Sequence, residues 1–325
     1  MQIKEVYKLV KEGLAGVDEQ FRLLARSQGE NFPELHKMLS HILSGRGKAV
    51  RPLLALHAGS LYHYDLQKIM YMATASELMH IATLVHDDAI DKASIRRGQL
   101  TINKIWGTDK AIIFGDYLFA KAAEYAVDTG SLRVVSLFSQ TLEAISYGEL
   151  KQGFSAFNLE QSYDQYIGRI AGKTASLLAL STEGGAVLSG APEESIKILS
   201  EYGLNLGISF QIVDDILDLI GTEQELGKPV GSDLAQGTIT LPTLMLLERY
   251  PENNPVKRIF KNEGDREKSI KEAIELVRNS QIVDECYRVA SDYSTRASRN
   301  LHLLPDTPSR QALFTMAEYV VKRKK

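Results

Sequence analysis

The chain has 325 residues and a formal net charge of -3, with 44% hydrophobic and 24% charged residues. This composition excludes a disordered chain, a collagen-like rod and a small disulfide-stapled protein. The near-neutral charge gives no general attraction to nucleic acid. The one cysteine, Cys286, has no partner for an internal disulfide, so we expect an unreactive thiol in a cytoplasmic protein. No uncharged apolar run reaches the roughly 18 residues of a membrane span.

Helical periodicity dominates the sequence. Proline, which costs about 3 kcal/mol inside a helix, is absent between Pro52 and Pro192. Apolar residues recur at spacings of three and four. They predict helices over residues 66–90, 110–127, 131–148, 161–180, 193–219, 241–249 and 269–301. Strand-like alternation is scarce, glycine-containing turns separate the helices, and no linker is visible. We therefore predict one all-α domain over residues 1–325, with a more loosely attached helical layer after Pro255.

Two of these helical stretches carry the same acidic pattern, Asp-Asp-x-x-Asp. The aspartates are Asp87, Asp88, Asp91, Asp214, Asp215 and Asp218. Aspartates four positions apart share a helix face, where like charges destabilise a bare helix by roughly 0.2–0.5 kcal/mol per pair. An all-oxygen ligand set without Cys/His spacing favours Mg²⁺. For one cluster a solvated acidic face is an equal alternative, but two clusters on apolar helices favour a metal-bound diphosphate.

Basic residues occur where the chain turns. A loop rich in glycine carries Lys48 and Arg51, and Arg96 and Arg97 follow the first acidic cluster. The loop does not have the spacing of a Walker A motif. Lys173 and Lys228 occur later, each beside a glycine. His80 lies two turns before the first acidic cluster. Taken singly, each of these fits an ordinary surface cation or a structural histidine, but together they suit an anionic substrate.

Four motifs occur in one order along the chain. They are Gly47-Lys48-x-x-Arg51-Pro52, Asp87-Asp88-x-x-Asp91 with Arg96-Arg97-Gly98, Lys173-Thr174, and Phe210-Gln211-x-x-Asp214-Asp215-x-x-Asp218. From about Gly45 to the carboxy terminus the chain thereby resembles the trans-isoprenyl diphosphate synthases, or polyprenyl synthetases, and most of all their medium- and long-chain members. The resemblance implies the isoprenoid synthase fold, a single large helical bundle around a deep central cavity.

The resemblance also implies roles for individual residues. Asp87, Asp91 and Asp214 would bind Mg²⁺, and Asp88, Asp215 and Asp218 would be further ligands or water-mediated supports. The allylic diphosphate would contact Arg96, Lys173 and Lys228. Isopentenyl diphosphate would contact Lys48, Arg51, His80 and Arg97. Gln211 would lie beside the growing allylic cation, and Thr174 belongs to the same substrate-binding set.

The implied reaction is a head-to-tail prenyl transfer from an allylic diphosphate to isopentenyl diphosphate. The allylic substrate would be farnesyl or geranylgeranyl diphosphate. The family is usually dimeric, and some catalytic chains work with a small regulatory subunit, so we expect a homodimer or such a heterodimer. Two positions depart from the family pattern. Ala49 replaces a loop arginine, and Thr238 replaces a lysine, which leaves the self-sufficiency of the chain open.

Small residues precede the first acidic cluster. Ala82 and Thr83 stand where short-chain members carry bulky aromatics, and Ser76 lies about 16 Å from Asp87 along the helix. Met79 would form an adjustable side wall. We therefore predict a product in the hexaprenyl-to-octaprenyl range. The alternatives are close helix packing without a tunnel, and a shorter farnesyl or geranylgeranyl product.

Other functions fit the residues less well. A terpene cyclase would need one diphosphate site only, whereas Lys48, Arg51 and Arg97 suggest a second. A non-catalytic regulatory subunit would be expected to lose aspartates. A nucleic-acid scaffold would need a basic face, and none is indicated. The final segment, 322–325, is a solvated tail, a cover for the diphosphate site, or a peripheral contact with anionic membrane lipid that aids product release.

Overall fold

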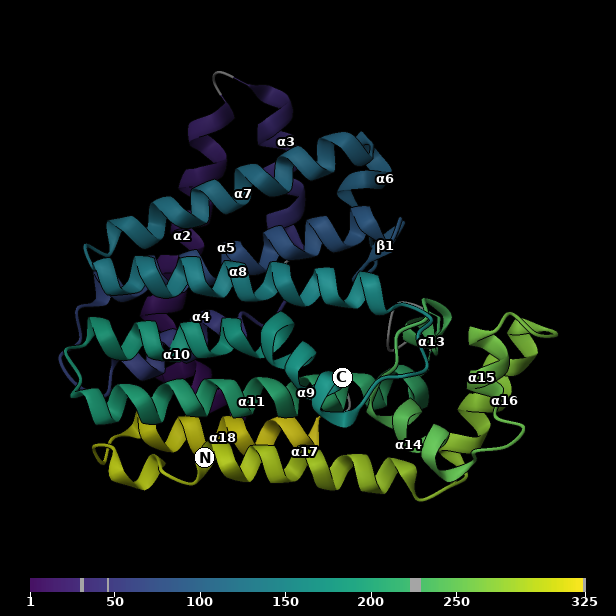
Figure 1. Ribbon diagram of the computed structural model, residues 1–325. Helices are drawn as coiled ribbons and strands as arrows, with labels where there is room; N and C mark the ends of the chain where they lie inside the picture. The colour runs from purple at the N-terminus through teal and green to yellow at the C-terminus, as the bar shows by residue number, and fades with distance from the viewer. Residues whose placement is uncertain (30–31, 46, 223–228, 324–325) are drawn as a thin grey trace. The chain divides into compact units, whose positions relative to one another are not determined.

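The computed structural model describes residues 1–29, 32–45, 47–222 and 229–323 (Figure 1). Helices joined by turns and loops make up this part of the chain, together with one short hairpin. The predicted all-α class is confirmed. The helices up to the hairpin are α1 (Ile3–Leu9), α2 (Lys11–Gly29), α3 (Pro33–Ser44), α4 (Val50–Gly59) and α5 (Leu66–Ile90). The hairpin, β1 (Ile95–Arg96) and β2 (Gln99–Leu100), is followed by α6 (Ile102–Trp106), α7 (Thr108–Asp128) and α8 (Leu132–Ser155).

The second half of the chain is helical as well. Its elements are α9 (Tyr163–Ile170), the π-helical turn η1 (Ala171–Ala175), α10 (Ser176–Leu188), α11 (Glu193–Ile220), α13 (Ser232–Ala235), α14 (Leu241–Arg249), α15 (Pro255–Phe260), α16 (Arg266–Arg278), α17 (Ile282–Ser298), the 3₁₀ turn η2 (Leu301–Leu303) and α18 (Pro308–Lys322). The helix predicted over 161–180 begins later and contains η1, and the one predicted over 269–301 is interrupted between α16 and α17.

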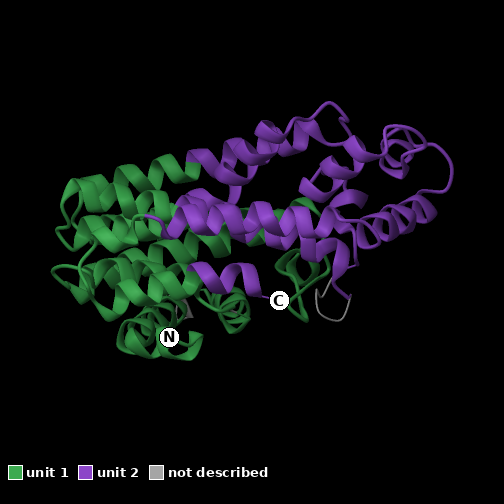
Figure 2. Ribbon diagram, turned by 90° about the horizontal axis from the view of Figure 1, so that it is seen from below, with its two compact units in different colours: residues 1–142, 177–203, 300–316 green, residues 143–176, 204–299, 317–325 purple. Residues whose placement is uncertain are grey.

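The described residues form two compact units (Figure 2). Unit 1 contains residues 1–142, 177–203 and 300–316, and unit 2 contains residues 143–176, 204–299 and 317–325. The candidate site residues before residue 142 therefore belong to unit 1. The candidate site residues from Lys173 onwards belong to unit 2.

Helix α5 is the central element of unit 1. Asp65 caps its amino terminus by accepting a hydrogen bond from the Lys68 amide. Its residues from Ile69 to Ala89 are buried on several faces, as expected for a helix surrounded by others. It packs against α4 and α7. The His86 imidazole fits between α5 and α7 because Gly115 of α7 has no side chain at that point. The acidic cluster is thus placed at the end of a fixed helix.

The hairpin that follows α5 is tightly turned. Ile95 pairs with Leu100, and Arg96 pairs with Gln99. Between them Arg97 and Gly98 have φ angles of 51° and 77°, the two positive values that a type I′ hairpin requires. This turn fixes the direction in which Arg96 and Arg97 leave the backbone.

Unit 2 is built around the second half of α11. Ile212, Val213 and Ile216 of α11 are buried in a cluster with residues of α9, α14, α16 and α17. Cys286 is buried in this cluster, and burial raises the pKa of its thiol to about 12. Among the described residues, none of the helices has both the length and the apolar character that crossing a bilayer requires.

Candidate functional site

The first acidic cluster occupies the carboxy-terminal turn of α5. The Asp91 amide donates to the Asp87 carbonyl at 2.8 Å, so the helical geometry extends over both residues. The helix dipole is negative at this end, which makes two carboxylates unfavourable there without a cation. Asp88 is different, because it is buried and accepts a 2.7 Å hydrogen bond from Arg96 Nε. Asp87 and Asp91 are therefore the more accessible members of the cluster.

The glycine-containing loop before α4 lies directly against the hairpin. Arg97 Nη1 donates to the Gly45 carbonyl at 3.2 Å. A Cβ on Gly47 would approach the Arg97 guanidinium to within 2.8–2.9 Å, so a side chain there would displace Arg97. The Lys48 side chain is exposed, and its carbonyl accepts a hydrogen bond from Tyr7. The glycines thus permit the contact between loop and hairpin.

His80 lies among the arginines of unit 1. Burial lowers its pKa well below the usual value, and the charges of Arg51, Arg97 and Arg96 lower it further. The imidazole is therefore neutral near pH 7. Glu77, one turn earlier on α5, is buried. Burial lowers the pKa of Arg97, and the charge of Glu77 raises it again. His80 and Glu77 line a small pocket between α5 and the hairpin, together with Asp88, Arg96 and Arg97. The pocket therefore offers two guanidinium groups as anion contacts, and two carboxylates balance their charge.

Ala49 begins α4 in an unusual conformation. Its φ and ψ angles of 48° and 44° are left-handed, which costs a residue with a side chain roughly 1–2 kcal/mol. Pro52 lies in the first turn of α4. The position where the family resemblance led us to expect an arginine is therefore a strained turn residue.

The second acidic cluster lies near the carboxy end of α11, and each of its aspartates has its own partner. Asp218 is buried and accepts a 2.8 Å hydrogen bond from the Ser232 hydroxyl at the start of α13. Asp215 is buried in the core of unit 2. The Asp214 side chain is 43% exposed, which makes it the accessible member of this cluster.

A chain of side-chain hydrogen bonds holds Asp215. Gln211 Nε2 donates to Asp215 Oδ1 at 2.8 Å, and the Tyr166 hydroxyl donates to Asp215 Oδ2 at 2.7 Å. The Thr174 hydroxyl donates to Gln211 Oε1 at 2.8 Å. Burial raises the pKa of Asp215, the nearby Asp233 raises it further, and these two hydrogen bonds to Asp215 oppose the rise.

Lys173 lies in the π-helical turn η1. Its Nζ is 2.5 Å from Glu149 Oε1 of α8. A Cβ on Gly172 would be 3.1 Å from the Ala144 carbonyl, so η1 and α8 approach closely at this point. Single π-helical turns inside α-helices occur frequently at functional sites. The turn directs Lys173 and Thr174 to two different partners, Glu149 and Gln211.

Arg323 at the end of the chain contacts the accessible aspartate of unit 2. Its Nη2 lies 2.6 Å from Asp214 Oδ1 and 2.7 Å from the Phe210 carbonyl. Its Cζ lies 3.7 Å from the centre of the Phe210 ring. The arginine side chain is only 7% exposed. Asp214 therefore already accepts a buried cation.

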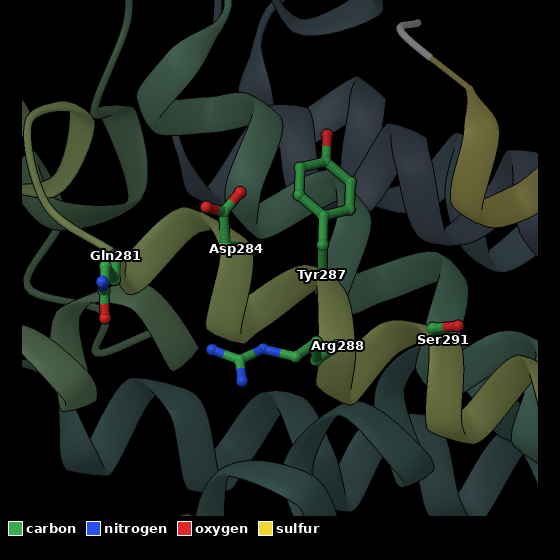
Figure 3. A pocket seen from close by; sticks show the side chains of 5 residues that line it. All are labelled: Gln281, Asp284, Tyr287, Arg288 and Ser291. Carbon is green, nitrogen blue, oxygen red and sulfur yellow. The ribbon is translucent and has the colours of Figure 1, made fainter.

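An open pocket of about 640 Å³ lies along α17 and its amino-terminal cap (Figure 3). Gln281, Asp284, Tyr287, Arg288 and Ser291 line it. Burial raises the pKa of Tyr287, and the charge of Arg323 opposes that rise. None of the predicted site residues lines this pocket.

The structure brings some predicted residues together and leaves others apart. In unit 1, Arg51, Arg96 and Arg97 act electrostatically on His80, and Arg96 also pairs with Asp88. In unit 2, Thr174, Gln211 and Asp215 are bonded in series. Lys228 lies outside the described residues. Thr238 is half-buried, and its amide donates to the Asp233 carbonyl.

Sequence reasoning missed four residues at these sites, namely Glu77, Glu149, Tyr166 and Arg323. Glu77 had a detectable signal, since it is a glutamate in an apolar helix three residues before His80. Arg323 belongs to the segment 322–325, for which the sequence leaves a solvated tail, a cover for the diphosphate site and a lipid contact open. Glu149 and Tyr166 gave no usable signal, because their partners are far away in the sequence or on another helix.

The carboxylates suit a divalent cation that is shared with a substrate. Within the described residues, no three acidic, histidine or cysteine side chains converge into a metal site of their own. Mg²⁺ is usually bound by one or two carboxylates with water and substrate phosphates. Asp87 and Asp91 are two such accessible carboxylates at the end of α5, and Asp214 is one in unit 2. The donor sets therefore fit Mg²⁺.

The predicted chain-length residues all lie on α5. Ser76, Met79 and Ala82 are fully buried, and Thr83 is half-buried with its hydroxyl bonded to the His80 carbonyl. No aromatic side chain occurs on α5 after Tyr71 apart from the imidazoles of His80 and His86. The helix thus keeps small residues on the turns before Asp87.

Fold and site together indicate an enzyme that acts on diphosphates. Residues 32–277 match the polyprenyl synthetase family. The chain is 36% identical over 324 residues to heptaprenyl diphosphate synthase component 2 of Bacillus subtilis (strain 168), covering 100% of this chain and 92% of that protein.

Solved structures agree with this match. A decaprenyl diphosphate synthase from Rhodobacter capsulatus superimposes with a TM-score of 0.92 at 33% identity, over 100% of both chains. A polyprenyl synthase from Caulobacter crescentus CB15, complexed with calcium and isoprenyl diphosphate, gives a TM-score of 0.93 at 32% identity, over 100% of this chain and 98% of that chain.

The class is that of the prenyltransferases with an isoprenoid synthase fold. The chain belongs to the polyprenyl synthetase family, and it is a polyprenyl diphosphate synthase. The resemblance inferred from the four motifs is thereby confirmed.

Proposed function

We propose that this enzyme adds isopentenyl diphosphate head-to-tail to farnesyl or geranylgeranyl diphosphate, with Mg²⁺ as the cofactor, and makes an all-trans polyprenyl diphosphate in the hexaprenyl-to-octaprenyl range. The observation that carries the proposal lies in unit 1. The charges of Arg51, Arg96 and Arg97 all act on a neutral His80, and Arg96 is bonded to Asp88 of the acidic cluster. An anion site next to a carboxylate cluster suits two diphosphate groups.

The residues have separate tasks in this reaction. Asp87, Asp91 and Asp214 would hold Mg²⁺, which neutralises charge on the departing diphosphate when it is bound. Lys173 and Lys228 would bind the allylic diphosphate with Arg96. Lys48, Arg51, His80 and Arg97 would bind isopentenyl diphosphate, with His80 neutral and able to donate one hydrogen bond.

The chemical step breaks the C–O bond between the allylic group and its diphosphate. The double bond of isopentenyl diphosphate then attacks the allylic cation and forms the new C–C bond, and a proton leaves to the departing diphosphate. The cation requires an environment without water. Gln211 would place its amide oxygen near the positive carbon, because a fixed dipole stabilises charge that develops in the transition state.

Small, buried residues on α5 support the product length. Ser76 and Ala82 are small, fully buried residues on the turns before Asp87, and the side chain of Met79 is flexible. Two relatives also carry names that specify longer products, heptaprenyl and decaprenyl. A farnesyl or geranylgeranyl product is the alternative if these residues serve only close helix packing.

The assembly is also part of the proposal. The Bacillus relative is named as component 2 of its enzyme, which supports a small partner subunit for this chain; the alternative is a homodimer. The departures at Ala49 and Thr238, each of which lacks a cation that we expected, favour a chain that gains activity from such a partner. Peripheral contact with lipid for product release is a further part of this expectation.

One assay tests these points. The purified chain is incubated with farnesyl diphosphate and isopentenyl diphosphate, with Mg²⁺ or with EDTA, and the products are sized. We expect six to eight isoprene units with Mg²⁺ and none with EDTA. Activity unaffected by EDTA would overturn the metal mechanism, and a farnesyl or geranylgeranyl end product would overturn the chain length. Activity that appears only after addition of a second protein would establish the two-component form.

A further inference from the structure

Tyr166 lies outside the four sequence motifs but takes part in the hydrogen-bonded series of Thr174, Gln211 and Asp215. It is fully buried in α9, and its hydroxyl donates to Asp215 Oδ2 at 2.7 Å. Burial raises the pKa of Tyr166 well above its usual value, so the hydroxyl keeps its proton and remains a donor. The other oxygen of Asp215 receives Gln211 Nε2 at 2.8 Å. Each carboxylate oxygen thus has a defined donor.

This arrangement determines which way the Gln211 amide points. The Thr174 hydroxyl donates to Gln211 Oε1 from one side, and Asp215 accepts from Nε2 on the other. While Asp215 is ionised, a flipped amide would place Oε1 against its Oδ1, with two acceptors facing each other at hydrogen-bond distance. The Asp215 carboxyl group can rotate unless its second oxygen is also hydrogen-bonded. The Tyr166 hydroxyl supplies this second hydrogen bond.

We propose that Tyr166 is a positioning residue for prenyl transfer, which fixes the amide orientation of Gln211 through Asp215. The inference rests on the proposed function, in which the carbonyl end of the Gln211 amide faces the allylic cation. The amide dipole stabilises that cation only in this orientation, because the NH₂ end carries partial positive charge. Asp215 then serves Gln211 directly, while Asp214 remains the accessible ligand of its cluster.

The variants are Tyr166→Phe and a matched control, Tyr202→Phe. Both tyrosines are fully buried, but the Tyr202 hydroxyl donates to the Leu313 carbonyl in unit 1 at 2.9 Å and does not contact the Gln211 series. Each variant loses one buried hydrogen bond, so each loses some stability. We expect kcat to fall about tenfold in Tyr166→Phe at an unchanged KM for the allylic substrate, because the interaction acts on the transition state. We expect Tyr202→Phe to retain kcat within about twofold.

A double-mutant cycle separates positioning from a purely structural role. Thr174→Val removes the opposite hydrogen bond to Gln211. If Tyr166 and Thr174 hold the same amide, the double variant loses clearly less activity than the product of the two single losses. Tyr202→Phe with Thr174→Val should be additive. Additive losses in both cycles, or a Tyr166→Phe kcat within about twofold of the wild type, would overturn the proposal.

Crystal structures of the variants give a readout that does not need activity. In Tyr166→Phe we expect Gln211 to separate from Asp215 or to show two amide orientations, and in Tyr202→Phe we expect the wild-type arrangement. An unchanged Gln211 geometry in Tyr166→Phe would also overturn the proposal. A wild-type enzyme without prenyl transfer would overturn the proposed function instead, and the crystal structures would still decide the positioning. If Tyr166→Phe does not fold, Asp215→Asn replaces it in the cycle, because it weakens the same connection at nearly equal volume.

Discussion

Asp88 and Asp215 are the second aspartates of their clusters, and both are buried against a partner outside the Asp-Asp-x-x-Asp pattern. The first aspartates, Asp87 and Asp214, are more accessible. Asp214 and Asp218 lie four positions apart in α11, and their partners come from other elements, since Ser232 binds Asp218 and Arg323 binds Asp214. The sequence predicts which residue types lie on one helix. It does not predict which neighbouring helix supplies the partner, because that depends on tertiary packing.

Arg323 should compete with the metal for Asp214. The buried Arg323 side chain places Nη2 2.6 Å from Asp214 Oδ1. A divalent cation can therefore bind both oxygens of Asp214 only after this contact breaks. We expect Arg323→Ala to tighten Mg²⁺ binding in the presence of inorganic diphosphate by roughly threefold to tenfold, because one charge-assisted hydrogen bond no longer has to be broken. Isothermal titration calorimetry measures this directly.

Lys322→Ala is the matched control for Arg323→Ala. Lys322 is exposed, and its Nζ lies 3.4 Å from Glu318 on the same helix, so its loss should leave the affinity unchanged. Weaker Mg²⁺ binding by Arg323→Ala would contradict competition, since it would mean that Arg323 helps to hold the metal-bound diphosphate.

The elements show where periodicity is reliable. The predictions for 66–90 and 241–249 agree with α5 and α14 at both ends, since each has a uniform apolar pattern and an interpretable amino-terminal cap. The predicted helix over 269–301 is wrong at Ser280, between α16 and α17. The Ser280 hydroxyl accepts a hydrogen bond from the Ile282 amide where α17 begins. The turn η1 could not be predicted, because it depends on the approach of Gly172 to α8 and not on the apolar period.

Helix α5 allows a graded test of product length. We expect Ala82→Phe to shorten the product, because a bulky ring close to Asp87 would stop chain growth early. Ser76→Phe, about 9 Å further along the helix, should stop growth later and give an intermediate product. Both positions are fully buried, so circular dichroism must first show that each variant is folded. Products of unchanged length from both variants would mean that the growing chain follows another path.

At the scale of the whole chain, the single domain over residues 1–325 stays a prediction. The family match over 32–277 includes residues of both compact units, which supports it. Within unit 1, His57 of α4 connects segments that are far apart in the sequence. Its Nε2 lies 3.1 Å from the Val6 carbonyl, and its Nδ1 lies 3.1 Å from the Ser309 hydroxyl. This connection was not predictable, because neither partner lies near His57 in the sequence.

His57 should make the protein sensitive to acid. Burial lowers its pKa from the usual value of 6.5 to about 4, so the folded state resists a proton that the unfolded state accepts. The free energy of unfolding should therefore fall as the pH decreases from about 6.5 to about 4, by on the order of 3 kcal/mol from this residue. His80 adds to the fall, because its pKa is lowered as well.

Urea unfolding at several pH values checks this prediction. His57→Gln cannot take up a proton, and we expect it to flatten the pH dependence between pH 6.5 and 4. His63→Gln, at an exposed position, should keep the wild-type pH profile. An equally steep profile in His57→Gln would show that another group is responsible.

The π-helical turn at Ala171–Ala175 makes the positions of Lys173 and Thr174 sensitive to the deletion of a single residue. A π turn accommodates one residue more than the α-helical turn it replaces, so deleting a single residue there would restore a regular helix. The flanking turns would keep the faces they now bury, while Lys173 and Thr174 would lose the offset that directs them to Glu149 and Gln211. A one-codon deletion would thus remove two substrate-binding candidates from an otherwise intact fold, and no single substitution achieves the same.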